Sequence, residues 1–187
     1  MSAELPTSEI EAVLAGTRAW LERAVIGLEL CPFARPAYVG DRIRFTVSAA
    51  RNEDALLEEL THELSALHST PEQSCETTLL IHPRVLGDFM EYNVFLDAAA
   101  RKVDSLGLRG EIQIASFHPR YQFAGTTPDD IGNYTNRSPY PMLHLLREAS
   151  VERAVAAIPD AAAIYERNIE TLRRLGIDGW RRMFPHP

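Results

Sequence analysis

Three short β-rich runs alternate with long helical runs, and this alternation restricts the possible folds more than any other feature of the chain. The β-rich runs cover residues 42–48, 77–82 and 111–117. The two segments between them, at residues 52–67 and 85–106, carry apolar side chains at helical spacing. Strands joined by connections this long run parallel, with right-handed crossovers. The sequence therefore predicts an α/β fold with a β-α-β-α-β core and a small, mostly parallel sheet of three or four strands.

Further helices are expected on both sides of this core. The N-terminal helix begins at a capping box, Ser8 to Glu11, and ends before Pro32, because proline cannot continue a helical hydrogen-bond ladder. On the C-terminal side we expect helices over residues 139–149, 151–157 and 160–175. The pattern predicts one globular domain over residues 1–187, with a core at about 8–176 and a tail at 177–187.

Composition excludes several classes of protein. No stretch longer than nine residues lacks a charged side chain, whereas a membrane-spanning helix needs about 20 mostly apolar residues. The first residues have neither the basic flank nor the apolar core of a secretion signal. The net charge of −7 argues against a protein that binds mainly to nucleic-acid phosphates. We expect a soluble, cytoplasmic protein without membrane attachment, whose two cysteines are free thiols.

Residues 117–137 form a long segment with neither helical nor strand periodicity. Loops longer than about 12–15 residues are uncommon in compact domains and are usually functional or disordered. Aromatic residues in the segment argue against disorder. The loop either covers a binding site or uses its polar groups only to satisfy its own backbone. The candidate substrate-binding residues in and after it are Tyr121, Asn133, Asn136, Arg137 and Ser138.

Several longer motifs resemble a known family. They are LCPFARPAYV at residues 30–39, TTLLIHPRVLGDFMEYN at 77–93, ASFHPRYQFAGTTPDD at 115–130, NYTNRSPYPMLHLLREASVERAV at 133–155 and ERNIETLRRLGIDGW at 166–180. Together they resemble domain-of-unknown-function family 1415, a largely bacterial family, over about residues 15–176. The resemblance implies a single domain and implies no activity, so the chemistry has to be inferred from the residues.

The same dipeptide ends two of the three β-rich runs: His82-Pro83 and His118-Pro119. In an open α/β sheet, ligands bind outside the carboxyl ends of the parallel strands. If the two strands are neighbours, both imidazoles leave one sheet edge and can share acid–base work, a substrate or a metal. Alternatively, each histidine caps backbone carbonyls at the end of its strand.

Cys31 is a third candidate catalytic residue, in the turn that follows the first helix. A nucleophilic cysteine needs thiolate character, and the negative end of the preceding helix dipole opposes it. The alternative is a small buried apolar residue. With His82 and His118, Cys31 could bind Zn or Fe, joined by Asp88, Asp129 or Asp130.

An anion site is expected where Arg137 precedes a helix capped by Ser138, because free helix N–H groups and a guanidinium favour phosphate or carboxylate. Otherwise Arg137 pairs with Asp129 or Asp130 and fixes the loop. In the same predicted helix, His144 and Glu148 lie four residues apart, a spacing typical of surface stabilisation.

Two classes of function remain open. The first is a small enzyme or ligand-binding protein for an anionic small molecule, with His82, His118 and Cys31 in a pocket under loop 117–137. The second is a non-catalytic interaction module that presents Tyr121, Phe123, Tyr134 and Tyr140 to a protein partner. RNA contact through these aromatic residues and arginines is disfavoured by the net charge.

Overall fold

The computed structural model describes residues 5–157 and 163–184 and shows an α/β fold built on a four-stranded sheet. The strands are β1 (Ile43–Val47), β2 (Thr77–Ile81), β3 (Ile112–Phe117) and β4 (Met142–Arg147). They lie in the order β1-β2-β4-β3, with β1 parallel to β2 and β4 antiparallel to both β2 and β3. The three predicted strands are present, but the sheet is mixed, so the expectation of a mostly parallel sheet is wrong.

The difference comes from β4, which occupies part of the helix expected over residues 139–149. Its sequence, MLHLLR, is a short, mostly apolar run with no strong period, and such runs fit a buried strand as well as a buried helix. Met142, Leu143 and Leu145 are fully buried between β2 and β3. The predicted N-cap, Ser138, therefore precedes a strand. His144 lies in β4 and Glu148 begins α5, so the two do not share one helical face.

The remaining long helices follow the sequence more closely, whereas two short ones, at residues 34–39 and 131–135, lie where no helix is expected. The helices are α1 (Thr7–Trp20) with its π-helical continuation η1 (Leu21–Ile26), α2 (Ala34–Val39), α3 (Glu53–Ser69), α4 (Phe89–Ser105), the 3₁₀ helix η2 (Ile131–Thr135), α5 (Glu148–Ala156) and α6 (Ala163–Met183). The predicted start of the last helix, at residue 160, lies outside the described residues. α6 kinks at Gly176, where φ is 67°, and continues through the predicted tail to Met183.

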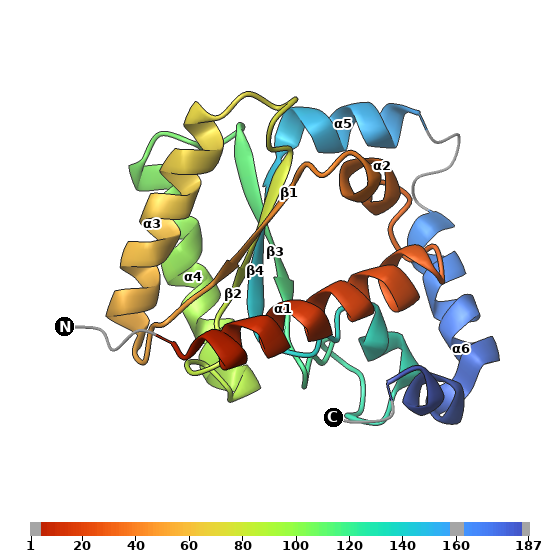
Figure 1. Cartoon of the computed structure of the whole chain (residues 1–187). Helices are drawn as coiled ribbons and strands as arrows, with labels where there is room; N and C mark the ends of the chain where they lie inside the picture. Colours follow the sequence, from red (N-terminus) through yellow and green to blue (C-terminus); the bar gives the residue numbers. More distant parts are fainter. Residues whose placement is uncertain (1–4, 158–162, 185–187) are drawn as a thin grey trace.

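Helices α3 and α4 cover one face of the sheet and α1 covers the other (Figure 1), and an apolar core lies on each face. One joins Leu80, Leu143 and Leu145 to the leucine stripe of α3 and to α4. The other joins Leu79, Ile81 and Met142 to α1, η1 and the end of α6. Strand side chains alternate between the faces, so β2 and β4 contribute to both cores.

Tyr92 on α4 connects the helix layer to the sheet. Its ring is fully buried, and its hydroxyl donates to Met142 O at 2.8 Å and accepts from Phe117 N at 3.1 Å. The hydroxyl therefore bridges the end of β3 to the start of β4.

Replacing Tyr92 with Phe is expected to reduce the free energy of unfolding by about 2 kcal/mol, because it leaves a buried donor and a buried acceptor without a partner. Urea denaturation at neutral pH measures the change. Tyr165→Phe removes a hydroxyl from a half-exposed ring and serves as the control, with no measurable loss expected. A Tyr92→Phe protein as stable as wild type would contradict the bridging role.

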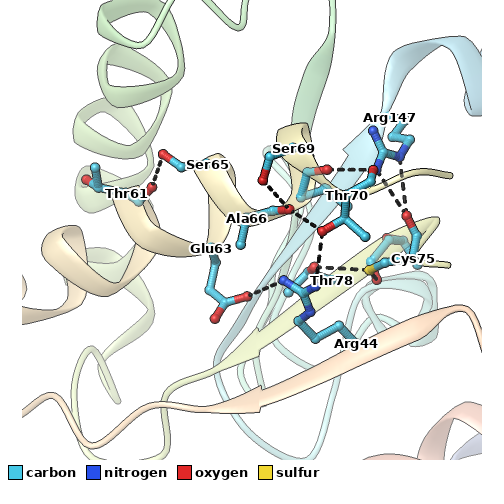
Figure 2. Close-up of polar contacts among 12 residues, drawn as sticks. Arg44, Thr61, Glu63, Ser65, Ala66, Ser69, Thr70, Cys75, Thr78 and Arg147 are labelled. Atoms are coloured by element: carbon cyan, nitrogen blue, oxygen red, sulfur yellow. Dashed lines mark hydrogen bonds and ion pairs between the residues drawn. The ribbon is translucent and has the colours of Figure 1, made fainter.

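Arg147, the last residue of β4, holds the C-terminal end of α3 (Figure 2). Its guanidinium donates to the carbonyls of Leu67 at 2.7 Å, Thr70 at 2.5 Å and Cys75 at 3.1 Å. Helices leave their last carbonyls without intrahelical partners, and a cation there also offsets the negative end of the helix dipole. One side chain thus joins α3, the following turn and the sheet.

Candidate functional site

His82 and His118 lie on the same face of the sheet, on either side of the Tyr92 ring. The ring centroid of Tyr92 is 5.8 Å from that of His82 and 5.1 Å from that of His118. The histidines follow β2 and β3, which are separated by β4, so they are not at the ends of neighbouring strands. Both residues have no exposed surface.

Each imidazole is bound to a carbonyl of the loop between β2 and α4. His82 Nδ1 donates to Val85 O at 3.0 Å. His118 accepts from the Arg120 amide at Nδ1, so its proton is on Nε2, which donates to Leu86 O at 3.1 Å. The structure therefore gives both rings the carbonyl contacts of the alternative interpretation.

The next carbonyl of this loop is held as well. The Arg120 guanidinium donates to Gly87 O at 2.6 Å, so three consecutive carbonyls are bound by side chains. Leu86 lies in the left-handed region at φ 57°, a conformation that costs free energy in a residue with a β-carbon. The two histidines and Arg120 keep the loop in this strained conformation.

Burial controls the protonation of both rings. Desolvation lowers the pKa of His82 to about 4, with a smaller contribution from the nearby His118. Desolvation is also the main reason that the pKa of His118 is lowered. His82 Nε2 is buried and has no hydrogen-bond partner among the described residues, so it cannot take up a proton without an unpaired buried charge.

Most of the predicted binding residues in loop 117–137 are used by the loop itself. Arg137 donates to Tyr121 O at 3.2 Å and to Pro128 O at 2.6 Å, and it stacks over Tyr134. Asn133 is buried, and its side chain accepts from Phe123 N. The predicted anion site is not formed, because the helix expected after Ser138 is absent and the guanidinium is bound to loop carbonyls.

Ser138 and Tyr121 also serve the packing of this region. The Ser138 hydroxyl donates to Tyr140 O at 2.7 Å. The Tyr121 ring lies 5.2 Å from Phe89 and 5.0 Å from Phe123, centroid to centroid. Sequence reasoning alone could not separate these packing contacts from ligand contacts.

Cys31 and Asn136 line a common cavity of about 360 Å³ at the carboxyl end of β3. Its wall combines residues from η1, the turn before α2, the end of β3, η2 and the start of α6. They are Val25, Leu30, Cys31, Phe117, Thr135, Asn136, Ile164, Tyr165 and Asn168. Two predicted site residues, Cys31 and Asn136, therefore meet in what we call the Cys31 cavity.

The backbone beside this cavity is irregular in two places. The first helix changes from α to π geometry over Leu21–Ile26, and π-helical turns occur frequently at functional sites. Glu29 then adopts the left-handed conformation at φ 55°, which turns the chain so that Cys31 N donates to Val25 O at 3.3 Å. Both irregularities place Cys31 at the cavity. Neither could be predicted from the sequence, because no glycine marks the residue with the left-handed conformation.

The Cys31 thiol is neutral at ordinary pH. Burial raises its pKa, and the neighbouring backbone at Phe33 and Ala34 only partly opposes that effect. Arg35, the nearest basic residue in sequence, does not line the cavity. The site thus provides a hydrogen-bonding thiol, without the cation or basic residue that generates a thiolate.

The structure does not bring the three predicted metal ligands together. Cys31 packs against the core on the α1 face, whereas His82 and His118 surround Tyr92 on the α4 face. In the described part of the chain, no group of three or more His, Cys, Asp or Glu side chains is placed to hold a metal ion. The three residues cannot share a metal ion because the sheet lies between Cys31 and the two histidines.

Sequence reasoning missed Asn168 and Tyr165, which α6 brings to the Cys31 cavity. Asn168 donates from Nδ2 to Leu30 O at 2.8 Å and so fixes the turn before Cys31. Tyr165 also lines this cavity, and its side chain is half exposed. An asparagine on an otherwise apolar helix face was the only available signal.

A second, more open cavity of about 530 Å³ lies at the carboxyl ends of β1 and β2, next to the strained loop. Arg51 and Arg84 line it together with Glu53, Asp54 and Glu91. Arg84 is already bound through its guanidinium to Glu9. Three carboxylates face two arginines here, so the cavity does not favour an anion.

Comparison with known proteins identifies the family. None of the described helices is both long and apolar enough to span a membrane. No curated protein and no solved structure matches the chain. One family model, described as "Protein of unknown function (DUF1415)", matches residues 12–182. Because this match covers most of the sequence, the chain belongs to the DUF1415 family.

Proposed function

We propose that the protein binds a small, uncharged organic molecule in the Cys31 cavity. One observation carries the proposal: Cys31, Asn136 and Phe117 come from three separate segments and line a single cavity at the carboxyl end of a strand. The volume of about 360 Å³ falls in the range typical of small-molecule sites, which are mostly apolar with a few polar groups.

The lining residues define the kind of ligand. None of them is charged, so an anion would lose its hydration without gaining a charged partner. Arg137, on which an anionic ligand depended, is bound to loop carbonyls instead. Asn136 and Asn168 use their nitrogens on backbone carbonyls, which leaves their side-chain oxygens to accept. The proposed ligand is neutral, with at least one O–H or N–H donor and an apolar part.

Cys31 acts in this proposal as a polar contact in its thiol form. Its raised pKa disfavours the thiolate that nucleophilic attack requires. His82 and His118 lie on the opposite face of the sheet, where they bind the carbonyls of Val85 and Leu86, and they take no part in the proposed binding. We therefore propose ligand binding, rather than acid–base or metal catalysis by the two histidines.

The alternative of a protein-interaction module has less support. Its aromatic residues pack against other rings, such as Tyr121 against Phe123 and Tyr134 against Trp180, each pair with centroids about 5 Å apart. A flat docking patch would instead present such rings to solvent.

Native mass spectrometry of the purified protein, with and without a panel of neutral hydroxyl and amide compounds, tests the proposal. We expect bound mass on the wild-type protein and slower alkylation of Cys31 by iodoacetamide when the compound is bound. Ile164→Trp fills the cavity and should abolish both effects. Val155→Trp, an equally large change at an exposed position of α5, should preserve them. Equal binding by the two variants, or none by the wild type, would refute the proposal.

A further inference from the structure

The outer edge of β3 is an unprotected sheet edge. β3 pairs with β4 on one side only, and its sequence, IQIASF, contains no charge and no proline. Soluble proteins normally protect such an edge with lysine, proline or a bulge, since its free N–H and C=O groups can pair with another chain. The β3 sequence itself provides none of those features.

The hydrogen-bond register identifies which groups face outward. Glu148 N donates to Glu111 O at 2.9 Å, and Phe117 N reaches Met142 O through the Tyr92 hydroxyl. Inward and outward groups alternate along an antiparallel strand. Residues 111, 113, 115 and 117 therefore face β4, and the backbone groups of Ile112, Ile114 and Ser116 face away from it.

Two of these six outward groups already have partners. Ile112 N donates to Leu108 O at 3.0 Å. Ser116 O accepts from the side-chain nitrogen of Asn136 at 3.0 Å. Within the described residues, the other four groups have no partner outside the sheet: Ile112 O, Ile114 N, Ile114 O and Ser116 N.

We propose that two copies of the chain form a symmetric dimer by pairing their β3 edges antiparallel, with the two-fold axis at Ile114. In this register Ile114 exchanges both hydrogen bonds with Ile114 of the second copy. Ser116 N then donates to Ile112 O of the second copy, and the symmetric bond forms as well. All four free groups are satisfied on each chain.

The two occupied groups explain why the partner is a second copy. In this register Ile112 N would face Ser116 O of the other chain, and both are already bonded within their own chain. An unrelated antiparallel peptide would instead leave its own groups at these two positions unpaired, at a cost of about 1–3 kcal/mol for each buried group. The edge is complementary to itself and not to extended chains in general.

The side chains of the edge agree with this register. Ile112 would lie opposite Ser116 and Gln113 opposite Ala115, so each of these two large side chains meets a small one, and Ile114 meets Ile114 at the axis. A groove of about 370 Å³ runs beside the edge, with Leu96, Ala100 and Ile114 in its wall. Ile114 of the second copy would lie beside this groove and cover the half-buried Ile114 of the first.

Sedimentation velocity over a concentration series, on the full chain, tests the dimer. We expect the wild type to approach about 42 kDa, twice the 20.9 kDa of one chain. Ile114→Lys places two positive charges at the axis and should leave a folded monomer, as judged by circular dichroism. Val39→Lys, the same kind of change at an exposed residue of α2, should still dimerise.

Amide hydrogen exchange supplies a second measurement that depends on the register. In wild type at high concentration, the amides of Ile114 and Ser116 should exchange slowly, and dilution or Ile114→Lys should make them fast. The amides of Gln113 and Ala115, which face β4, should stay protected throughout. A monomeric wild type, a dimer that survives Ile114→Lys, or fast exchange at Ile114 within the dimer would overturn the proposal.

Discussion

Lowering the pH from 6.5 to 4 is expected to remove about 3 kcal/mol from the free energy of unfolding through His82 alone. Burial lowers the pKa of His82 from 6.5 to about 4 in the folded protein. The unfolded chain therefore binds a proton at this residue over a range in which the folded protein does not. Each pKa unit corresponds to about 1.4 kcal/mol, which gives this magnitude.

The sign of the effect follows directly. The contribution of His82 is fully present above pH 6.5, falls as the pH drops, and is lost near pH 4. Burial also lowers the pKa of His144 to about 4, so that residue adds loss over the same range. Denaturant titrations at several pH values measure the slope.

His82→Gln should be less stable than wild type at pH 7 and show a flatter dependence on pH, because the titrating group is gone while the Val85 carbonyl loses its donor. His62→Gln removes an exposed histidine from α3 and should leave the slope unchanged. An unchanged slope in His82→Gln would show that the ring is not held neutral by the fold.

Replacing Arg147 with Met is expected to cost about 4 kcal/mol, a larger loss than for any other single change discussed here. The substitution keeps much of the apolar stem but removes the donors to Leu67 O, Thr70 O and Cys75 O. Hydrogen bonds from charged groups are each worth about 1.5–3 kcal/mol, and solvent entering this half-buried site recovers part of the loss. The α3 dipole also loses its compensating cation.

Arg153→Met is the matched control, because Arg153 makes only an exposed ion pair with Glu72 and a contact to Ser150. Exposed pairs contribute little, so a change within about 0.5 kcal/mol is expected there. Arg147→Lys should fall between the two, since an ammonium cannot reach three carbonyls with the planar geometry of a guanidinium. Urea denaturation of the three variants compares them, and equal stability of Arg147→Met and Arg153→Met would contradict the anchoring role.

The parts of the fold that could be predicted from sequence are those with strong local signals. Asn52 caps α3 by accepting from Ala55 N, as its position before the leucine stripe indicates. The three β-rich runs are strands, and their order along the chain is as expected. These features depend on local side-chain spacing and on capping, which a sequence displays directly.

The candidate site could be predicted only in part from the sequence. Cys31 and Asn136 were selected by residue type and do line one cavity. His82 and His118 were selected by a repeated dipeptide, and the structure binds both to the loop after β2. A histidine that caps a carbonyl and one that faces a ligand look alike in sequence, because the difference depends on a backbone segment distant along the chain.

The sequence by itself determined the class of the fold and the three strands joined by crossover helices. It also identified residues whose side chains could act in catalysis or binding. Only the tertiary structure decided that MLHLLR enters the sheet as β4 and separates β2 from β3. The physical reason is that a short apolar run can be buried equally well as a helix or as a strand. Which of the two forms depends on whether neighbouring strands, far away in the sequence, have unpaired edges that can bind it. That choice made the sheet mixed and left β3 at its edge.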